Sequence, residues 1–125
     1  MFWRKIINYG ESIGIGGVIL YLSLFRTISL EAPLFEGADK LVHFILYYLL
    51  GTALAIDLYR AQIPIKNLFI IAISVATVYG GVIELLQEYY FPPRTGEWLD
   101  WIADIAGAII GVVLVWMIKK NSSTR

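Results

Sequence analysis

The chain has no cysteine and only one histidine among its 125 residues. The absence of cysteine excludes disulfide bonds, thiolate nucleophiles and cysteine-ligated metals, so any chemistry must use other side chains. An excess of charge of either sign is also lacking, because ten Lys and Arg residues balance ten Asp and Glu residues. With no basic stripe, RNA-binding signature or Cys/His finger, the sequence argues against a nucleic-acid-binding protein.

Apolar residues are what the chain has in excess, at 58% of the sequence and a mean hydropathy of +0.70. Soluble domains contain about 45–50% apolar residues. The excess lies in blocks of nearly membrane-spanning length, and the total length suits one domain. We therefore predict an all-α fold, an integral membrane bundle of four transmembrane helices in a single domain. The helices are expected at about residues 9–25, 40–58, 67–88 and 97–118, with 119–125 as a polar cytoplasmic tail.

Lysine and arginine are distributed unequally between the two sides that this topology creates. The side with both termini and the second loop carries seven of the ten, and the other side carries Arg26, Lys40 and Arg94. Because cytoplasmic loops favour Lys and Arg, both termini are predicted to be cytoplasmic. The first and last helices each contain a G-x-x-x-G pair, Gly10 with Gly14 and Gly107 with Gly111. Such pairs allow close helix approach, either inside the bundle or in a homodimer.

Ionisable and amide residues occur in three stretches that the predicted topology brings to the outer side of the membrane. A charge near the bilayer centre costs about 2.5–3.5 kcal/mol, so these side chains are expected to point inward and meet. Spacings of three and four residues place several of them on shared helix faces. The predicted ligand-binding cluster consists of Asp39, Lys40, His43, Glu84, Gln87, Arg94, Asp100 and Asp104.

Simpler roles are open to part of this set. Lys40 and Arg94 could be interfacial side chains that extend toward water, and Asp39 could be a helix N-cap. Glu84 and Asp104 fall inside hydrophobic runs, so membership of a polar cluster is the better interpretation for them.

Three kinds of function fit the cluster. It could bind a polar ligand, with basic residues meeting phosphate or carboxylate and acids meeting an amine or a metal. It could be the site of a membrane-embedded enzyme, although there is no H-E-x-x-H motif and no clear nucleophile. It could also be a structural polar latch that fixes helix register without chemistry.

The enzyme hypothesis has its own candidate residues. His43, Glu84 and Asp104 are the candidate catalytic residues, and with Asp100 they are candidate ligands of a divalent metal, because imidazole and carboxylate suit such ions. Alternatively, His43 would act as a general base oriented by Asp39 or Glu84. A divalent metal is the one cofactor that the sequence indicates.

Several short motifs follow one another along residues 39–111: Asp39-Lys40-x-x-His43-Phe44, Tyr47, Leu50-Gly51, Glu84-Leu85-x-Gln87, Arg94, Asp100 and Gly107-Ala108-x-x-Gly111. Their order and spacing resemble the VanZ-like family. At the position of Asp104 the family commonly has Asn, so this chain carries a carboxylate where the family has an amide donor.

The resemblance implies a multi-pass protein of the bacterial cytoplasmic (inner) membrane with a role in the cell envelope. The family's namesake is associated with resistance to the glycopeptide teicoplanin, so glycopeptide tolerance is one function that it suggests. It implies no particular reaction. The expected partners are the lipid bilayer and a lipid headgroup or envelope precursor.

Overall fold

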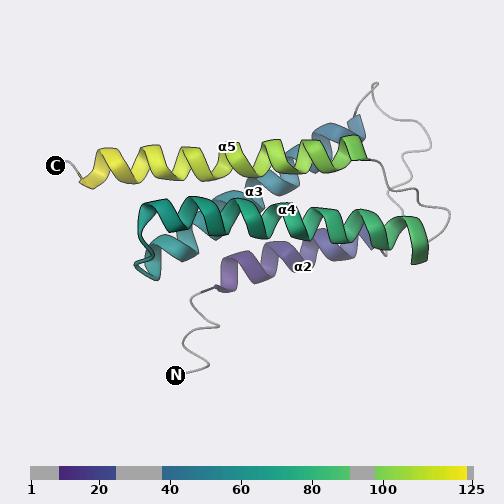
Figure 1. The fold of residues 1–125 in the computed structure, drawn as a ribbon, viewed down its shortest axis with the longest axis horizontal. Helices are drawn as coiled ribbons and strands as arrows, with labels where there is room; N and C mark the ends of the chain where they lie inside the picture. The colour runs from purple at the N-terminus through teal and green to yellow at the C-terminus, as the bar shows by residue number, and fades with distance from the viewer. Residues whose placement is uncertain (1–8, 25–37, 91–97, 124–125) are drawn as a thin grey trace.

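The structure, a computed structural model, describes residues 9–24, 38–90 and 98–123. Consecutive helices run antiparallel (Figure 1), so the starts of α3 and α5 lie beside the end of α4 at one end, here named the cluster end. The α3–α4 turn, the start of α2 and the end of α5 lie at the opposite end, the turn end. The all-α prediction is confirmed: the described residues form α2 (Gly10–Leu24), α3 (Ala38–Arg60), α4 (Ile65–Tyr90) and α5 (Trp98–Ser123).

Three of these helices are long and apolar enough to cross a membrane, at Lys40–Arg60, Ile65–Leu86 and Trp98–Lys120. The fourth, α2, is apolar but has 15 residues. That length corresponds to about 22 Å, whereas the hydrocarbon core of a bilayer is about 30 Å thick. Within the described residues the predicted membrane bundle therefore has three helices of spanning length and one shorter helix. The predicted end of the first helix at residue 25 lies outside the described residues.

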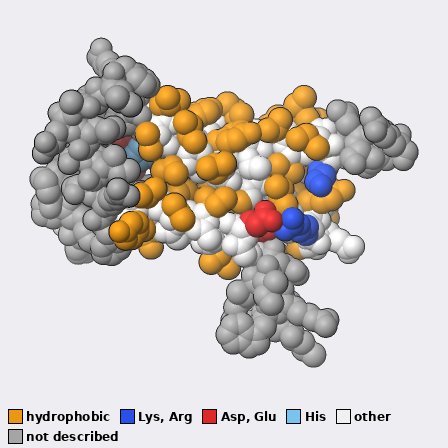
Figure 2. Space-filling model, turned by 180° about the vertical axis from the view of Figure 1, so that it is seen from behind, with side chains coloured by type: hydrophobic (Ala, Val, Ile, Leu, Met, Phe, Trp, Pro, Cys, Tyr) orange, Lys and Arg blue, Asp and Glu red, His pale blue; other side chains and the backbone are white. Residues whose placement is uncertain are grey.

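Apolar side chains both fill the core and cover the outside of the bundle. Ile19, Tyr47, Leu68 and Val112 are fully buried between helices. Large hydrophobic side chains on every helix are exposed, and Figure 2 shows them covering most of one face between the two ends. Helices that are apolar all round belong in a hydrophobic solvent, which is the environment that a bilayer provides.

Helices α3 and α5 make the most extensive contact in the bundle, and glycine allows it. A Cβ atom at Gly51 would lie 2.5 Å from the carbonyl oxygen of Ala108, and one at Gly111 would lie 2.5 Å from that of Tyr48. A Cβ at Gly107 would collide with the carbonyl oxygen of Phe44. The two backbones therefore touch, as small residues permit in membrane helices.

The two G-x-x-x-G pairs behave differently in the structure. Gly107 and Gly111 serve packing inside the bundle, where they contact α3. A Cβ at Gly10 or Gly14 would meet no atom of the described residues within 4 Å. The first pair is therefore an open face of α2, and its use in a dimer stays a prediction.

Helices α4 and α5 contact through aromatic side chains: Phe69 packs edge-on against Trp116 at a centroid distance of 5.9 Å, and Trp101 packs nearer the cluster end. Trp101 lies over the paired glycines of α4, 3.3 Å from Cβ positions built at Gly80 and Gly81. Its Nε1–H donates a 2.8 Å hydrogen bond to the carbonyl oxygen of Thr77. Because Gly80 and Gly81 have no side chains, α4 leaves room for this large aromatic residue, which links α5 to α4.

The α3–α4 turn is short and has a Schellman-type hydrogen-bond pattern. Gln62 N–H bonds to the Tyr59 carbonyl at 3.0 Å, and Ile63 N–H bonds to the Leu58 carbonyl at 3.1 Å. Gln62 takes the left-handed conformation that this motif requires, with φ of 62°. Pro64 follows, and its carbonyl accepts the first hydrogen bond of α4, from Leu68.

Helix α5 continues past Ile118, where the sequence predicts a polar tail. Lys119 Nζ lies 5.0 Å from the ring centroid of Tyr59, and Lys120 Nζ lies 4.8 Å from that of Trp116. Cations at the end of a helix also interact favourably with its dipole. These contacts explain why the helix extends into the polar residues.

Candidate polar binding site

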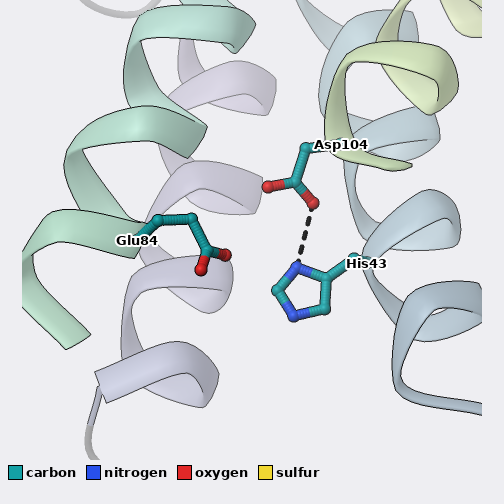
Figure 3. A group of neighbouring side chains, drawn as sticks. All are labelled: His43, Glu84 and Asp104. Atoms are coloured by element: carbon teal, nitrogen blue, oxygen red, sulfur yellow. Dashed lines mark hydrogen bonds and ion pairs between the residues drawn. The ribbon is translucent and has the colours of Figure 1, made fainter. Parts of the chain in front are cut away.

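The centre of the polar cluster is formed by one side chain from each of three helices, His43 of α3, Glu84 of α4 and Asp104 of α5. His43 Nδ1 lies 2.9 Å from Asp104 Oδ1, and an ionised Asp104 carboxylate accepts this hydrogen bond from an Nδ1–H. The Glu84 carboxylate points toward this pair (Figure 3). One potential ligand atom from each of the three residues lies within 4.8 Å of the others.

Burial makes the electrostatics of this centre strong. Asp104 is 1% exposed and Glu84 is 8% exposed, while His43 is partly buried. Two carboxylates within 4.8 Å of each other repel strongly where water is scarce. An imidazolium, a cationic ligand group or a metal ion would offset that repulsion.

Asp100 and Lys40 extend the cluster toward the end of the bundle. Asp100 Oδ2 lies 3.7 Å from His43 Nε2, and Asp100 Oδ1 lies 3.6 Å from Lys40 Nζ. Asp100 is one helical turn before Asp104, so both acids face α3. The imidazole therefore has a carboxylate near each nitrogen, Asp104 at Nδ1 and Asp100 at Nε2.

The glycine contacts of the α3–α5 interface hold this arrangement. Gly107 lies against Phe44, the residue after His43, and Gly107 is one turn beyond Asp104. Gly80, one turn before Glu84, lies beside Asp104, whose Oδ2 would be 3.0 Å from a Cβ there. The cluster is thus placed by helix faces that are in direct contact.

The remaining predicted residues are placed only in part. Asp39 and Gln87 belong to α3 and α4, but the positions of their side chains lie outside the described part of the structure. Arg94 lies outside the described residues altogether. Five of the eight predicted members are thus brought together, namely Lys40, His43, Glu84, Asp100 and Asp104.

The general-base hypothesis named Asp39 or Glu84 as the residue that orients His43. In the structure Asp104 is hydrogen-bonded to the imidazole, and the side chain of Asp39 lies outside the described part. Asp104 reaches His43 across the close α3–α5 contact, whereas Glu84 belongs to α4.

Tyr47 is a member of the site that the sequence interpretation did not include among its candidates. Its side chain is 1% exposed, and among the described residues its hydroxyl has no hydrogen-bond partner. The sequence could have indicated Tyr47, because it follows His43 by four residues and this spacing places both side chains on one face of α3.

An open groove lies between α4 and α5. Its volume is about 650 Å³. Glu84 lies both in this groove and in the cluster, so the two are continuous. The lining is apolar and aromatic apart from two acids and a threonine, and consists of Thr77, Val78, Gly81, Val82, Glu84, Leu85, Glu88, Trp98 and Trp101.

A second polar cluster at the turn end was not foreseen from the sequence. Asp57 is fully buried, and its Oδ2 accepts hydrogen bonds from the Ser12 N–H at 3.0 Å and the Ser12 hydroxyl at 2.7 Å. Arg60 Nη1 lies 2.8 Å from Glu11 Oε1 and 3.9 Å from Asp57 Oδ1. This cluster, together with a Tyr79 hydrogen bond to the Gly16 carbonyl, fastens α2 to the bundle.

The fold and the cluster together define a helical membrane protein with a polar site between its helices. A family model described as VanZ/LLP1 matches residues 3–119. The chain therefore belongs to the VanZ/LLP1 family, which confirms the VanZ-like resemblance. No curated protein and no solved structure matches the chain.

Proposed function

We propose that the protein binds a lipid-linked molecule of the bacterial cell envelope, with the headgroup at the polar cluster and the hydrocarbon chain in the α4–α5 groove. The observation that carries the proposal is the place of Glu84, which belongs to both the groove and the cluster. A lipid needs a continuous path from apolar to polar surroundings, and this path begins among Val78, Val82 and Leu85 and ends at Glu84 and Asp104.

The charges indicate what the headgroup would carry. Lys40 beside Asp100 would meet a phosphate or carboxylate at the rim, and the buried acids Glu84 and Asp104 would hold an amine. A zwitterionic headgroup with phosphate and amine matches both. The ligand class is therefore an amine-bearing, phosphate-linked lipid or envelope precursor, and glycopeptide tolerance would follow from altered handling of such a molecule.

A membrane-embedded enzyme acting on the same class of molecule is the second candidate. One observation favours it: Asp104 holds Nδ1 of His43, and Nε2, with Asp100 Oδ2 3.7 Å away, would exchange a proton with a bound substrate. Mass spectrometry of lipids incubated with purified protein distinguishes the two, because an enzyme gives a new product and a binding protein returns the lipid unchanged.

Orientation is part of the proposal. With Arg60, Lys66, Lys119 and Lys120 at the turn end, that end is inferred to face the cytoplasm of the inner membrane, and the cluster end to face outward. Reporter fusions to each terminus test this; activity of an extracytoplasmic reporter at the C-terminus would reverse the placement of the site.

The binding proposal is tested with photoreactive diazirine phosphatidylethanolamine in nanodiscs. Crosslinks are expected at residues that line the groove. Val78→Trp, which fills the groove, should reduce them several-fold, and Ile110→Trp, a change at another exposed residue, on α5 and outside the groove lining, should not. Glu84→Gln should weaken headgroup selectivity while crosslinking by a lipid without an amine persists.

Two results would contradict the proposal. Crosslinks spread evenly over the exposed apolar faces would identify ordinary surrounding lipid. Loss of thermal stability in Glu84→Gln and His43→Asn, with teicoplanin susceptibility and lipid binding both unchanged, would identify the cluster as a structural latch.

A further inference from the structure

We propose that His43, Glu84 and Asp104 bind one divalent transition-metal ion, with Zn²⁺ as the ion that these ligands fit best. The three side chains come from three helices, and one ligand atom of each lies within 4.8 Å of the others. This inference uses no property of the groove, and it makes zinc an alternative to the lipid amine, because the same two carboxylates, Glu84 and Asp104, would hold either one.

The spacing of the ligand atoms is close to that of a metal site. Bond lengths of about 2.0–2.2 Å put two ligands of a tetrahedral zinc about 3.3–3.5 Å apart. His43 Nδ1 and Asp104 Oδ1 lie 2.9 Å apart, so this pair needs to open by only a few tenths of an ångström. The ion would take the place of the proton between them, and a small rotation of the longer Glu84 side chain would bring its carboxylate into range (Figure 3).

The charge of the ligand set also suits a divalent ion. Glu84 and Asp104 are both buried, and their two negative charges would balance the two positive charges of the metal. The bound site would then be neutral overall, which is the least costly state in a membrane. A neutral imidazole with two carboxylates is a mixed set that favours zinc over the all-oxygen sites of magnesium and calcium.

The surroundings provide the outer contacts that metal-binding histidines require. With Nδ1 on the metal, the proton of His43 lies on Nε2, where Asp100 Oδ2 is 3.7 Å away and can accept it after a small shift. The Tyr47 hydroxyl is buried one helical turn after His43 and has no hydrogen-bond partner among the described residues. It would donate to a ligand carboxylate or to a water in the fourth position of the metal.

The test uses full-length protein purified in detergent, stripped with a chelator and titrated with ZnCl₂. Calorimetry should show about one Zn²⁺ per chain, and zinc should raise the melting temperature. His43→Gln and Asp104→Asn should each weaken zinc binding at least ~100-fold, and Asp100→Asn, which removes an outer contact, about tenfold. Asp57→Asn is the matched control, because it changes a fully buried carboxylate of α3 at the opposite end and should leave zinc affinity unchanged.

Folding of each variant is checked by circular dichroism, so that loss of zinc binding is read only from folded protein. If a variant of a proposed metal ligand is unfolded, the wild-type protein still tests zinc binding through its zinc stoichiometry and the change in its melting temperature with zinc. No zinc uptake by the wild type, or equal uptake by the folded His43→Gln and Asp104→Asn variants, would overturn the proposal. Because the readout is zinc alone, failure here leaves the lipid-binding proposal to be judged by its own crosslinking result.

Discussion

The carboxylate of Asp57 on α3 holds Ser12 on α2 by two hydrogen bonds, one to its backbone N–H and one to its hydroxyl, across 45 positions of sequence. Substitution of Asp57 by Ala should destabilise the protein by about 1–3 kcal/mol, because buried donors of Ser12 lose their acceptor. Unfolding in mixed detergent micelles measures the effect. Glu11→Gln, a change in an exposed ion pair, should cost less than about 0.5 kcal/mol, and equal effects of the two would contradict this account.

Gly107→Ala should separate α5 from α3. The added methyl group would collide with the backbone of Phe44, and overpacking of this kind costs about 1–3 kcal/mol. The matched control is Gly14→Ala, which meets no described atom within 4 Å and should be neutral or stabilising by up to about 1 kcal/mol. A chemical shift change at His43 in Gly107→Ala alone would report the altered α3–α5 distance.

Gln62→Gly should stabilise the α3–α4 turn. Gln62 has φ of 62°, a conformation that costs about 1–2 kcal/mol for a residue with a side chain. Part of that gain is lost to the greater freedom of glycine in the unfolded chain, so the net gain should be about 0.5–1 kcal/mol. Ala61→Gly, at a neighbouring position without a positive φ, should instead be destabilising, and a loss of stability in Gln62→Gly would show that the turn is not strained.

Trp101→Phe should loosen α4 from α5. The substitution keeps an aromatic ring over Gly81 but removes the donor to the Thr77 carbonyl, at a cost of about 0.5–1.5 kcal/mol. Trp98→Phe is the comparison, because Trp98 lines the same groove but is 68% exposed, and it should change stability less. Amide exchange at Thr77 and its neighbours should increase only in the Trp101 variant.

The helices and the meeting of the polar residues could be predicted because both depend on patterns along the chain. Long apolar runs indicated helices of spanning length, and antiparallel succession placed His43, Glu84 and Asp104 at the same end. Those inferences need only the direction of each helix and the rise per residue.

The identity of contacting atoms could not be predicted in the same way. The choice of Asp104 as the partner of His43 depends on how far α3 and α5 approach, which is decided by backbone contacts at Gly51, Gly107 and Gly111. The pairing of Asp57 with Ser12 depends on the rotation of α2 about its axis, and an apolar helix with little one-sided patterning does not specify that rotation.

The glycine contacts make the His43–Asp104 side of the cluster mechanically stiff, because the backbones that carry these residues already touch and cannot move closer. Glu84 stands on α4, which contacts α5 through side chains: Trp101 and Asp104 pack against the glycines of α4, and Phe69 packs against Trp116. A ligand that enters between α4 and α5 would therefore displace Glu84 and leave the other two residues in place. The His43–Asp104 side of the site is therefore fixed and the Glu84 side can move, so the position of α4 sets the size of the ligand that the site can hold.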